Sequence, residues 1–409
     1  MQETPKGSRL HIAILGRRNA GKSSLINILT NQKVAVVSDI PGTTTDPVYK
    51  SMEILPIGPV MIIDTAGIDD SGYLGTLRVE STMKVLNKAD LVLIVLEAES
   101  GMTQYEKTLI EGIKAKKIPI IGVINKSDKI VVSPELIKEW SKEFNIPLLP
   151  TSVKNRQGIE ELKKLIISFA PVEWQGPPVV GDLMQPKDFV ILVTPIDSSA
   201  PKGRLILPQV QTIRDIIDHN GIAIVVKETE LKETIANLRQ LPKLIVTDSQ
   251  AFERVSLETP PGVMLTSFSI LFARYKGDLE RLVSGIKSIE RLKPGDKVLI
   301  AEACTHHQQA DDIGTVKIPK WLQEKVGGHL EFEWTTGTNF PENLNKYSLI
   351  VHCGACMLNR KEMIHRLSTV SNEAVPIVNY GILIAYIHGV LQQALEPFPE
   401  IQRILREKK

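Results

Sequence analysis

Short apolar runs alternate with amphipathic stretches along the whole chain. In the first part the pattern predicts buried strands at residues 11–16, 60–64, 91–96 and 119–125, with helical stretches between them that include 23–30 and 103–115. Apolar runs of this length that alternate with helices are typical of a parallel sheet covered by helices on both faces. The pattern therefore predicts the α/β fold class.

The same alternation recurs twice after a segment rich in proline and glycine. Residues 171–187 hold four prolines and two glycines and are interpreted as a linker. A second unit follows, with strands predicted at 189–194, 222–226 and 243–247 and helices at 208–219 and 231–239. A third has strands predicted at 298–301, 349–351 and 375–378. We therefore expect three α/β units, at residues 1–172, 173–275 and 276–409.

Composition excludes several classes of protein. Hydrophobic residues make up 43% of the chain, and 49 basic against 47 acidic residues give a net charge of +2, which argues against a nucleic-acid partner. The most apolar long segment, 374–395, contains Pro376, Asn379 and His388, so we expect a buried helix and no membrane span. Three cysteines do not make a secreted disulfide framework, and residues 1–5 lack an apolar leader stretch, so we expect a reducing cytoplasm.

A phosphate-binding loop is predicted directly after the first strand. Residues 16–23 read Gly-Arg-Arg-Asn-Ala-Gly-Lys-Ser, between a strand and a helix. The glycines let backbone N–H groups approach phosphate oxygens, and the positive end of the following helix faces the anion. Lys22 is expected to reach the β- and γ-phosphates, and Ser23 to bind Mg²⁺. The predicted nucleotide contacts in this segment are Gly16, Asn19, Ala20, Gly21, Lys22, Ser23 and Ser24.

Two further strand ends carry the other parts of a nucleotide site. Asp64 begins Asp-Thr-Ala-Gly; its carboxylate is expected to hold Mg²⁺ through water, and Gly67 can bend toward a γ-phosphate. Asn125, Lys126 and Asp128 form Asn-Lys-Ser-Asp, in which the carboxylate can accept from the N1–H and N2–H₂ donors of guanine. Each tetrapeptide alone is a weak signal, but the three motifs in this order predict a GTP site.

About residues 8–170 resemble the TrmE–Era group of G-domains. The group's switch I reads Gly-Thr-Thr-Arg-Asp, whereas residues 42–46 here read Gly-Thr-Thr-Thr-Asp. The resemblance implies that Thr44 is the switch threonine on Mg²⁺, with a catalytic role beside Lys22. It also implies that the segment holding Ser152 and Val153 contacts the guanine base.

Ile68 stands where Ras-like proteins have a glutamine that orients water, so intrinsic hydrolysis should be slow. Related GTPases with an asparagine at the Asn19 position bind K⁺ there, and the resemblance implies K⁺-stimulated, Mg²⁺-dependent hydrolysis of GTP. The alternative for Asn19 is an ordinary turn residue.

All three cysteines fall in one late pattern, Cys304-Thr-His306 and then His352-Cys353-Gly-Ala-Cys356. Two sulfurs in Cys-x-x-Cys can reach one ion, and Cys304 with either histidine would complete a tetrahedral zinc site. An iron–sulfur cluster, redox chemistry at the Cys-x-x-Cys pair, and three inert buried cysteines are the alternatives. Both halves of the pattern directly follow predicted strands, so the sulfurs converge if those strands are neighbours.

The G-domain, the middle α/β unit and the terminal thiol pattern together resemble the HydF family of FeFe-hydrogenase maturation GTPases. The resemblance implies that Cys304, Cys353 and Cys356 hold a 4Fe–4S cluster with one labile iron site. His306 and His352 match the family's two histidines, each a weak fourth ligand or a donor to cyanide or sulfur; a backbone hydrogen bond is the plain alternative. Asp311 or an exchangeable water is a further alternative for the fourth position.

The family receives a di-iron precursor built with the radical enzymes HydE and HydG, and delivers it to apo FeFe-hydrogenase. It is dimeric through the middle unit, so a homodimer is expected. The competing hypothesis is a K⁺-dependent GTPase in tRNA modification or ribosome assembly with a structural zinc site.

Overall fold

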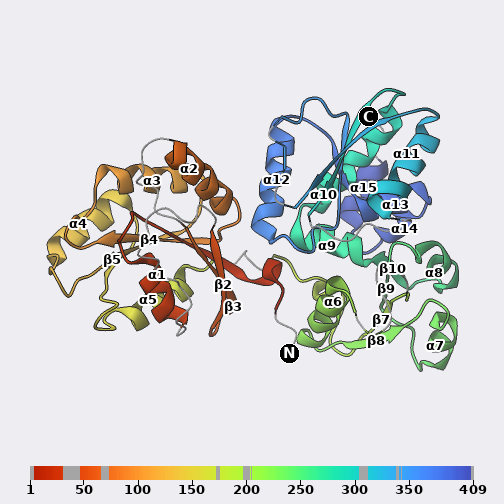
Figure 1. Cartoon of the computed structure of the whole chain (residues 1–409). Helices are drawn as coiled ribbons and strands as arrows, with labels where there is room; N and C mark the ends of the chain where they lie inside the picture. The colour runs from red at the N-terminus through yellow and green to blue at the C-terminus, as the bar shows by residue number, and fades with distance from the viewer. Residues whose placement is uncertain are drawn as a thin grey trace. The chain divides into compact units, whose positions relative to one another are not determined.

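A six-stranded sheet organises the first unit of the computed structural model, residues 1–174 (Figure 1). The strands are β1 (Leu10–Leu15), β2 (Val48–Ile54), β3 (Gly58–Asp64), β4 (Leu91–Glu97), β5 (Ile120–Asn125) and β6 (Leu148–Pro150). Their order is β2-β3-β1-β4-β5-β6, with β2 antiparallel to β3 and the other pairs parallel. The structure describes residues 4–30, 47–65, 73–171, 176–196, 203, 205–303, 312–337, 340–341 and 343–406, with the backbone alone at 73–79 and 406.

Helices cover both faces of this sheet, as the continuous apolar strands require. They are α1 (Lys22–Thr30), α2 (Tyr73–Leu86), α3 (Gln104–Ala115), α4 (Pro134–Phe144) and α5 (Ile159–Phe169). Helices α1 and α5 contribute Leu25 and Leu162 to the core of one face. Helices α2, α3 and α4 contribute Val85, Ile110 and Phe144 to the other (Figure 1). The doubly covered parallel sheet confirms the predicted fold class.

Two four-stranded parallel sheets lie within the second unit, residues 175–409. The first, in the order β10-β9-β7-β8, contains β7 (Phe189–Val193), β8 (Ile222–Val226), β9 (Leu244–Thr247) and β10 (Met264–Ser267). The second, in the order β12-β11-β13-β14, contains β11 (Lys297–Glu302), β12 (Glu331–Thr336), β13 (Leu349–His352) and β14 (Ile377–Asn379).

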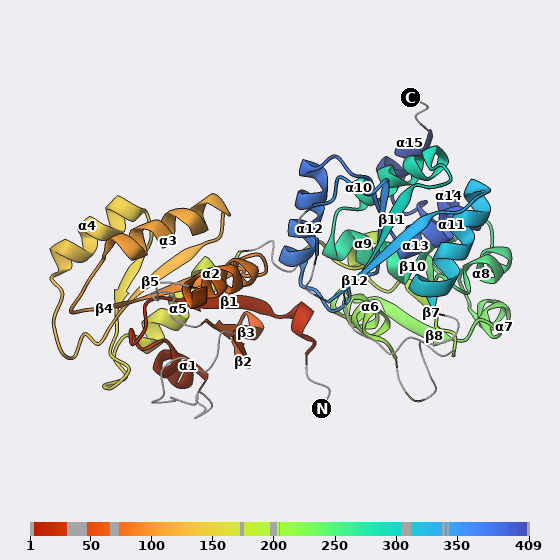
Figure 2. The same cartoon turned by 45° about the horizontal axis from the view of Figure 1, so that its top comes forward.

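One contiguous core joins the two sheets of the second unit. Its helices are α6 (Leu207–Asp218), α7 (Leu231–Asn237), α8 (Phe252–Glu258), α9 (Phe268–Lys276), α10 (Leu279–Ser284), α11 (Ile318–Val326), α12 (Arg360–Asn372), α13 (Tyr380–Ile387), α14 (Leu391–Ala394) and α15 (Pro399–Arg406). Helix α9 buries most of its side chains and packs against α6, α12 and α13 (Figure 2). The Ser267 hydroxyl caps its start by accepting from Ile270 N.

Short 3₁₀- and π-helical segments complete the description. They are η1 (Lys6–Ser8), η3 (Gly181–Leu183), η4 (Gly285–Arg291) and the π-helical η5 (Ile313–Lys317).

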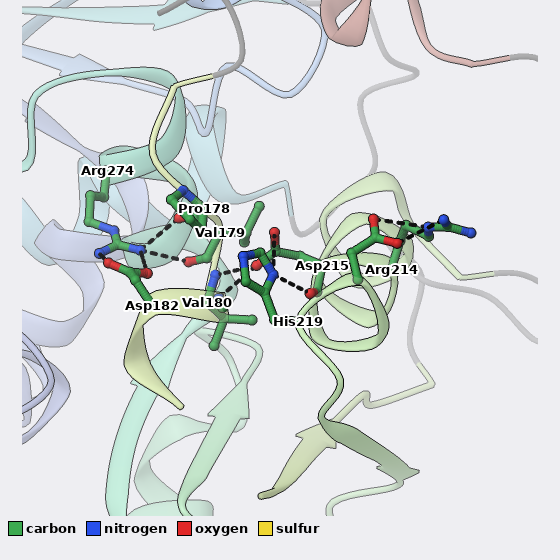
Figure 3. Close-up of polar contacts among 10 residues, drawn as sticks. Pro178, Val179, Val180, Asp182, Arg214, Asp215, His219 and Arg274 are labelled. Carbon is green, nitrogen blue, oxygen red and sulfur yellow. Dashed lines mark hydrogen bonds and ion pairs between the residues drawn. The ribbon is translucent and has the colours of Figure 1, made fainter. Parts of the chain in front are cut away.

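Part of the predicted linker is docked on the second unit; we call residues 176–183 the docked linker (Figure 3). Arg274 of α9 donates to both carboxylate oxygens of Asp182, each at 2.7 Å, and to the carbonyl of Pro178. On the other side, Asp215 of α6 accepts from Val180 N at 2.8 Å and from Gly181 N at 2.7 Å. The backbone of this segment therefore has specific partners, unlike that of a free tether.

One sequence expectation was wrong in detail. Residues 374–395 do not form one buried helix: they contain strand β14, then α13 and α14. The polar residues within the segment explain the break, because Asn379 ends β14 and caps α13 by accepting from Ile382 N at 2.8 Å. Among the described residues, no helix is both long and apolar enough to cross a membrane.

Candidate functional site

The phosphate loop joins β1 to α1 at the carboxyl edge of the first sheet. Gly16 has a φ of 144°, and a Cβ atom there would lie 2.3 Å from Val95 O, so only glycine fits. The Lys22 ammonium donates to the carbonyls of Gly16 and Arg17, both at 2.8 Å. The lysine therefore folds back over the loop in which phosphates are expected. Ser24 follows on the exposed side of α1.

Two of the three predicted magnesium ligands, Ser23 and Asp64, lie side by side. Strands β1 and β3 pair in parallel with Ile14 opposite Asp64, and Ser23 Oγ donates to Asp64 Oδ2 at 3.0 Å. Burial raises the pKa of Asp64, while Ser23 and the nearby lysines oppose that shift. A divalent cation would favour the ionised carboxylate at this position. Thr44 and Gly67, the other predicted switch contacts, lie outside the described residues.

The base-recognition motif contacts the phosphate loop directly. Asn125 Nδ2 donates to the Ala20 carbonyl at 2.9 Å, and a Cβ atom on Gly21 would lie 2.2 Å from the same nitrogen. Asn125 Oδ1 is buried without a hydrogen-bond partner in the described part of the chain. A buried acceptor of this kind fits a ligand that brings its own donor. The structure thus brings the phosphate and base motifs into contact.

The segment after β6 positions the carboxylate of Asp128, which is predicted to bind the guanine base. Ser152 Oγ donates to Asp128 Oδ1 at 2.7 Å, and this bond is the first cause of a lowered pKa at Asp128. An ionised carboxylate is the form that accepts from the guanine donors. Val153 lies half-buried beside Ser152, and Lys126 donates to Glu97 Oε1 at 2.6 Å. Asp128 and Ser152, two of the predicted base contacts, are thus in direct contact.

The sequence reasoning missed one support of the phosphate loop. Arg17 Nε donates to Glu106 Oε1 at 2.7 Å, and Arg17 Nη2 donates to Ser100 Oγ at 2.6 Å. Glu106 is fully buried and also accepts from Thr103 N at 3.0 Å. The Thr-x-x-Glu spacing is the sequence signature of a helix capping box, but it does not indicate that its carboxylate also holds an arginine.

At the other candidate site, the strands that precede the two halves of the thiol pattern are neighbours. Strands β11 and β13 pair in parallel with Ala301 opposite His352, and Cys353 N donates to Ala301 O at 2.9 Å. Ala303 N donates to Cys353 Sγ at 3.1 Å. Cys304 is covalently bonded to Ala303 but lies outside the described residues, as do His306 and Asp311.

The Cys-x-x-Cys turn places two thiols at the carboxyl edge of β13. Cys353 and Cys356 are both half-buried, and Ala355 between them has a φ of 52°, which is uncommon for a residue other than glycine. Burial raises the pKa of Cys353 to about 11, so without a metal its thiol is protonated at neutral pH. A thiolate-binding metal would displace that proton.

His352 is buried at the end of β13 with both ring nitrogens engaged. Nδ1 lies 2.8 Å from the Cys353 carbonyl, and Nε2 lies 3.1 Å from Arg366 Nη1. Burial is the first cause, and Arg366 the second, of a pKa lowered to about 4. The imidazole is therefore neutral at physiological pH.

The donor set at this edge fits a thiolate-binding metal group. Two cysteines share one turn, and a backbone amide already points at one sulfur, as is common around metal-bound sulfur. Within the described ranges, which omit Cys304 and His306, no three His, Cys, Asp or Glu side chains are grouped to hold a metal ion.

Models of known families match three successive segments of the chain, one for each of its three sheets. Residues 11–126 match the model of the 50S ribosome-binding GTPase. Residues 179–277 match the hydrogen maturase F dimerization domain, and residues 280–397 match the hydrogen maturase F tetramerization domain. The first unit is thus a GTPase domain, and the names of the other two models indicate self-association.

Curated relatives resemble the first unit alone. The tRNA modification GTPase MnmE of Lactobacillus helveticus is 39% identical over 172 residues, which are 40% of this chain and 35% of that protein. MnmE of Nostoc sp. is 38% identical over 162 residues, covering 39% of this chain and 34% of the relative. The chain therefore spans about a third of the length of these relatives.

Solved structures align weakly with the whole chain. The G domain of T. maritima FeoB aligns with 26% identity and a TM-score of 0.32, covering 40% of this chain and 99% of that one. Aquifex aeolicus Era bound to GDP·AlF₄⁻ aligns with 19% identity and a TM-score of 0.37, covering 80% and 92%.

The two matches to hydrogen maturase F domains cover more than half of the chain, and they follow a GTPase domain in sequence. Together with the cysteines that follow β13, this arrangement assigns the chain to the hydrogen maturase F family, HydF.

Proposed function

We propose that this protein is a GTP-hydrolysing scaffold that holds a 4Fe–4S cluster and delivers a di-iron precursor to apo FeFe-hydrogenase. The cluster would be held by Cys304, Cys353 and Cys356. The precursor, with its CO and CN⁻ ligands, is the cargo, and it would come from the radical enzymes HydE and HydG. We propose a cytoplasmic location, which the odd number of cysteines and the need for reduced thiols support.

The observation that carries the proposal is the pairing of β11 with β13. The two halves of the thiol pattern are about 50 residues apart in sequence, yet Ala303 N donates to Cys353 Sγ at 3.1 Å. Cys304 directly follows Ala303 in the sequence, so it is attached to a residue that contacts Cys353. This placement supports convergence of three sulfurs in a chain that matches HydF models over both later domains.

Three thiolates leave one iron of a 4Fe–4S cluster without a strong protein ligand, and that iron would supply an exchangeable position for cargo. The protein's own part is to orient sulfur. The Ala303 amide fixes the direction of one sulfur lone pair, and the left-handed Ala355 turns the chain so that Cys356 returns to the same edge. His306, His352, Asp311 and water remain the alternatives for the fourth position.

The first unit would act as the switch. Lys22 would neutralise the β- and γ-phosphates, while Ser23, Asp64 and Thr44 would hold Mg²⁺. The contact between Ser23 and Asp64 at 3.0 Å supports a shared cation. We further propose that K⁺ binds at Asn19 and supplies positive charge during hydrolysis. Hydrolysis would change partner contacts through order–disorder of the switch segments.

Self-association would use the second unit. Strand β8 is an edge strand of its sheet, and Ile222 and Val225 on it are 41% and 42% exposed. An edge strand with exposed apolar side chains is a template for pairing with another chain. We propose a homodimer through residues 173–275, with residues 276–409 as the cluster-binding domain.

The competing function is a K⁺-dependent GTPase in tRNA modification or ribosome assembly with a structural zinc site. The MnmE relatives would favour it, but their similarity ends with the first unit. A tetrahedral zinc site would need a histidine beside the three sulfurs. Both ring nitrogens of His352 already have partners, so His306 would have to supply that fourth ligand.

Anaerobic purification followed by iron, sulfide and zinc analysis tests the proposal. We expect iron and sulfide in comparable amounts, and an EPR spectrum of the reduced protein that shifts when imidazole is added. A shift on addition reports an iron with an exchangeable ligand. A colourless protein loaded with zinc, which cannot be reconstituted with ferrous iron and sulfide, would overturn the cluster assignment.

A further inference from the structure

The contacts of His352 define its protonation state without reference to any metal. Arg366 has only hydrogen-bond donors on its guanidinium, so the 3.1 Å contact requires Nε2 of His352 to accept. The proton of the neutral ring is therefore on Nδ1. That nitrogen faces the Cys353 carbonyl at 2.8 Å, which can only accept. The two contacts agree on a single tautomer.

Arg366 is itself firmly fixed. Its residue is 3% exposed, and Nη2 donates to the Gly337 carbonyl at 2.6 Å. The guanidinium carbon lies 5.1 Å from the centre of the Phe340 ring. Within the described part of the chain, its ion-pair partner is Glu362, whose Oε1 is 3.6 Å from Nη2, which is too long for a good hydrogen bond. Burial of a cation is costly, and further negative charge nearby would reduce that cost.

The thiol site would supply negative charge once a metal group displaces the thiol protons. Arg366 contacts His352, and His352 is bonded directly to Cys353 at the start of the Cys-x-x-Cys turn. Arg366 thus contacts the residue that immediately precedes the proposed cluster ligand Cys353. Its charge would favour thiolate over thiol and would partly offset the negative charge of three thiolates.

We propose that Arg366 is a positioning residue of the thiol site, which occupies the Nε2 lone pair of His352 and places a fixed positive charge behind Cys353. The inference rests on the proposed cluster function. His352 then orients the turn through its bond to the Cys353 carbonyl and does not fill the fourth position. The alternatives for that position narrow to His306, Asp311 or an exchangeable ligand.

The first test uses the metal-free, full-length protein, so it does not depend on cluster assembly. The chain has eight histidines, and selective ¹⁵N-histidine labelling with the His352→Gln variant assigns the signal of His352. We expect a neutral ring with the proton on Nδ1 in the natural protein. A proton on Nε2, or a charged ring at neutral pH, would overturn the inference even if no variant at position 366 folds.

The second test uses protein reconstituted with ferrous iron and sulfide. With Arg366 in place, the nitrogen hyperfine coupling to the reduced cluster should be the same whether position 352 holds histidine or glutamine. Arg366→Met removes both the donor and the charge, so a coupling should appear that the double variant with His352→Gln loses. Arg366→Gln keeps a donor but removes the charge, so no coupling should appear and the cluster's midpoint potential should become more negative.

Arg281→Gln is the matched control. Arg281 is a half-buried arginine of α10 that donates to the Leu367 carbonyl at 3.0 Å rather than to His352. Its loss should leave the hyperfine spectrum and the potential unchanged. A coupling already present in the natural protein and lost in His352→Gln would overturn the inference. Failure of the natural protein to take up iron would instead reject the cluster function, while the first test would still decide the role of Arg366.

Discussion

Asn19 holds the phosphate loop in a conformation that most residues avoid. Its φ is 61°, in the left-handed region that asparagine and glycine tolerate best. Its side chain can supply an oxygen to a monovalent cation beside the phosphates. Because glycine keeps the same backbone without the oxygen, a substitution at this position separates the conformation of the loop from its proposed ion contact.

We predict that Asn19→Gly removes stimulation of GTP hydrolysis by K⁺. If the ion replaces a charge-stabilising donor, the loss should be on the order of 10²-fold in rate. Steady-state phosphate release in KCl and in NaCl measures it. Asn145→Gly is the control, because Asn145 is also left-handed, with a φ of 44°, but caps the end of α4. Equal rates of the natural protein in the two salts would show that K⁺ has no role.

At this scale, the predictable residues were those in short motifs with a fixed chemical meaning. Asp64 and Asn125 could be placed from the sequence because each ends an apolar strand, and parallel strands bring their carboxyl ends to one edge. Arg366 could not be predicted, because its partner lies 14 residues earlier and nothing in the intervening pattern marks the contact. Thr44, Gly67, Cys304 and His306 lie outside the described residues, so their roles stay predictions.

Among the elements, the docked linker is held mainly by one carboxylate on its α6 side. Asp215 Oδ2 accepts two backbone N–H groups, and His219 packs so closely that a Cβ atom on Gly181 would lie 2.2 Å from its ring (Figure 3). These contacts fix the point at which the chain enters the second unit.

We predict that Asp215→Asn destabilises the docked linker, since the amide has one acceptor oxygen and no charge. The free energy of unfolding of the second unit should fall by about 1–2 kcal/mol, and limited proteolysis should become faster within residues 171–187. Urea denaturation measures the first effect. Asp218→Asn is the control, because Asp218 forms an exposed ion pair with Arg214 on the same helix, and such pairs contribute little. Equal losses in both variants would contradict the assigned role.

The strands that the sequence analysis did not predict all lie at the edge of a sheet. They are β2, β6, β10 and β12. An edge strand is covered less, so its sequence is shorter or more polar than that of a central strand. β12 reads Glu-Phe-Glu-Trp-Thr-Thr and has no fully buried residue. Central strands such as β4 are buried along almost their whole length, and hydrophobic runs predicted them well.

Across the whole molecule, the two units have separate cores. We predict that Lys22→Ala abolishes GTP hydrolysis but leaves the cluster absorbance unchanged, while Cys353→Ser loses the cluster and keeps hydrolysis. Phosphate release and visible absorbance of the reconstituted protein measure the two functions. Lys138→Ala, an exposed lysine of α4, should affect neither. Loss of both functions in either single-site variant would indicate one merged site.

The missing side chain of Gly21 has a consequence for how such a protein can change over time. Because the amide of Asn125 fills the space beside that α-carbon, the proposed phosphate-binding loop and the proposed base-recognition motif are in direct contact there. A substitution that enlarges position 21 disturbs both together. We therefore expect changes of nucleotide preference to arise at other positions, such as Asp128, whose carboxylate contacts Ser152.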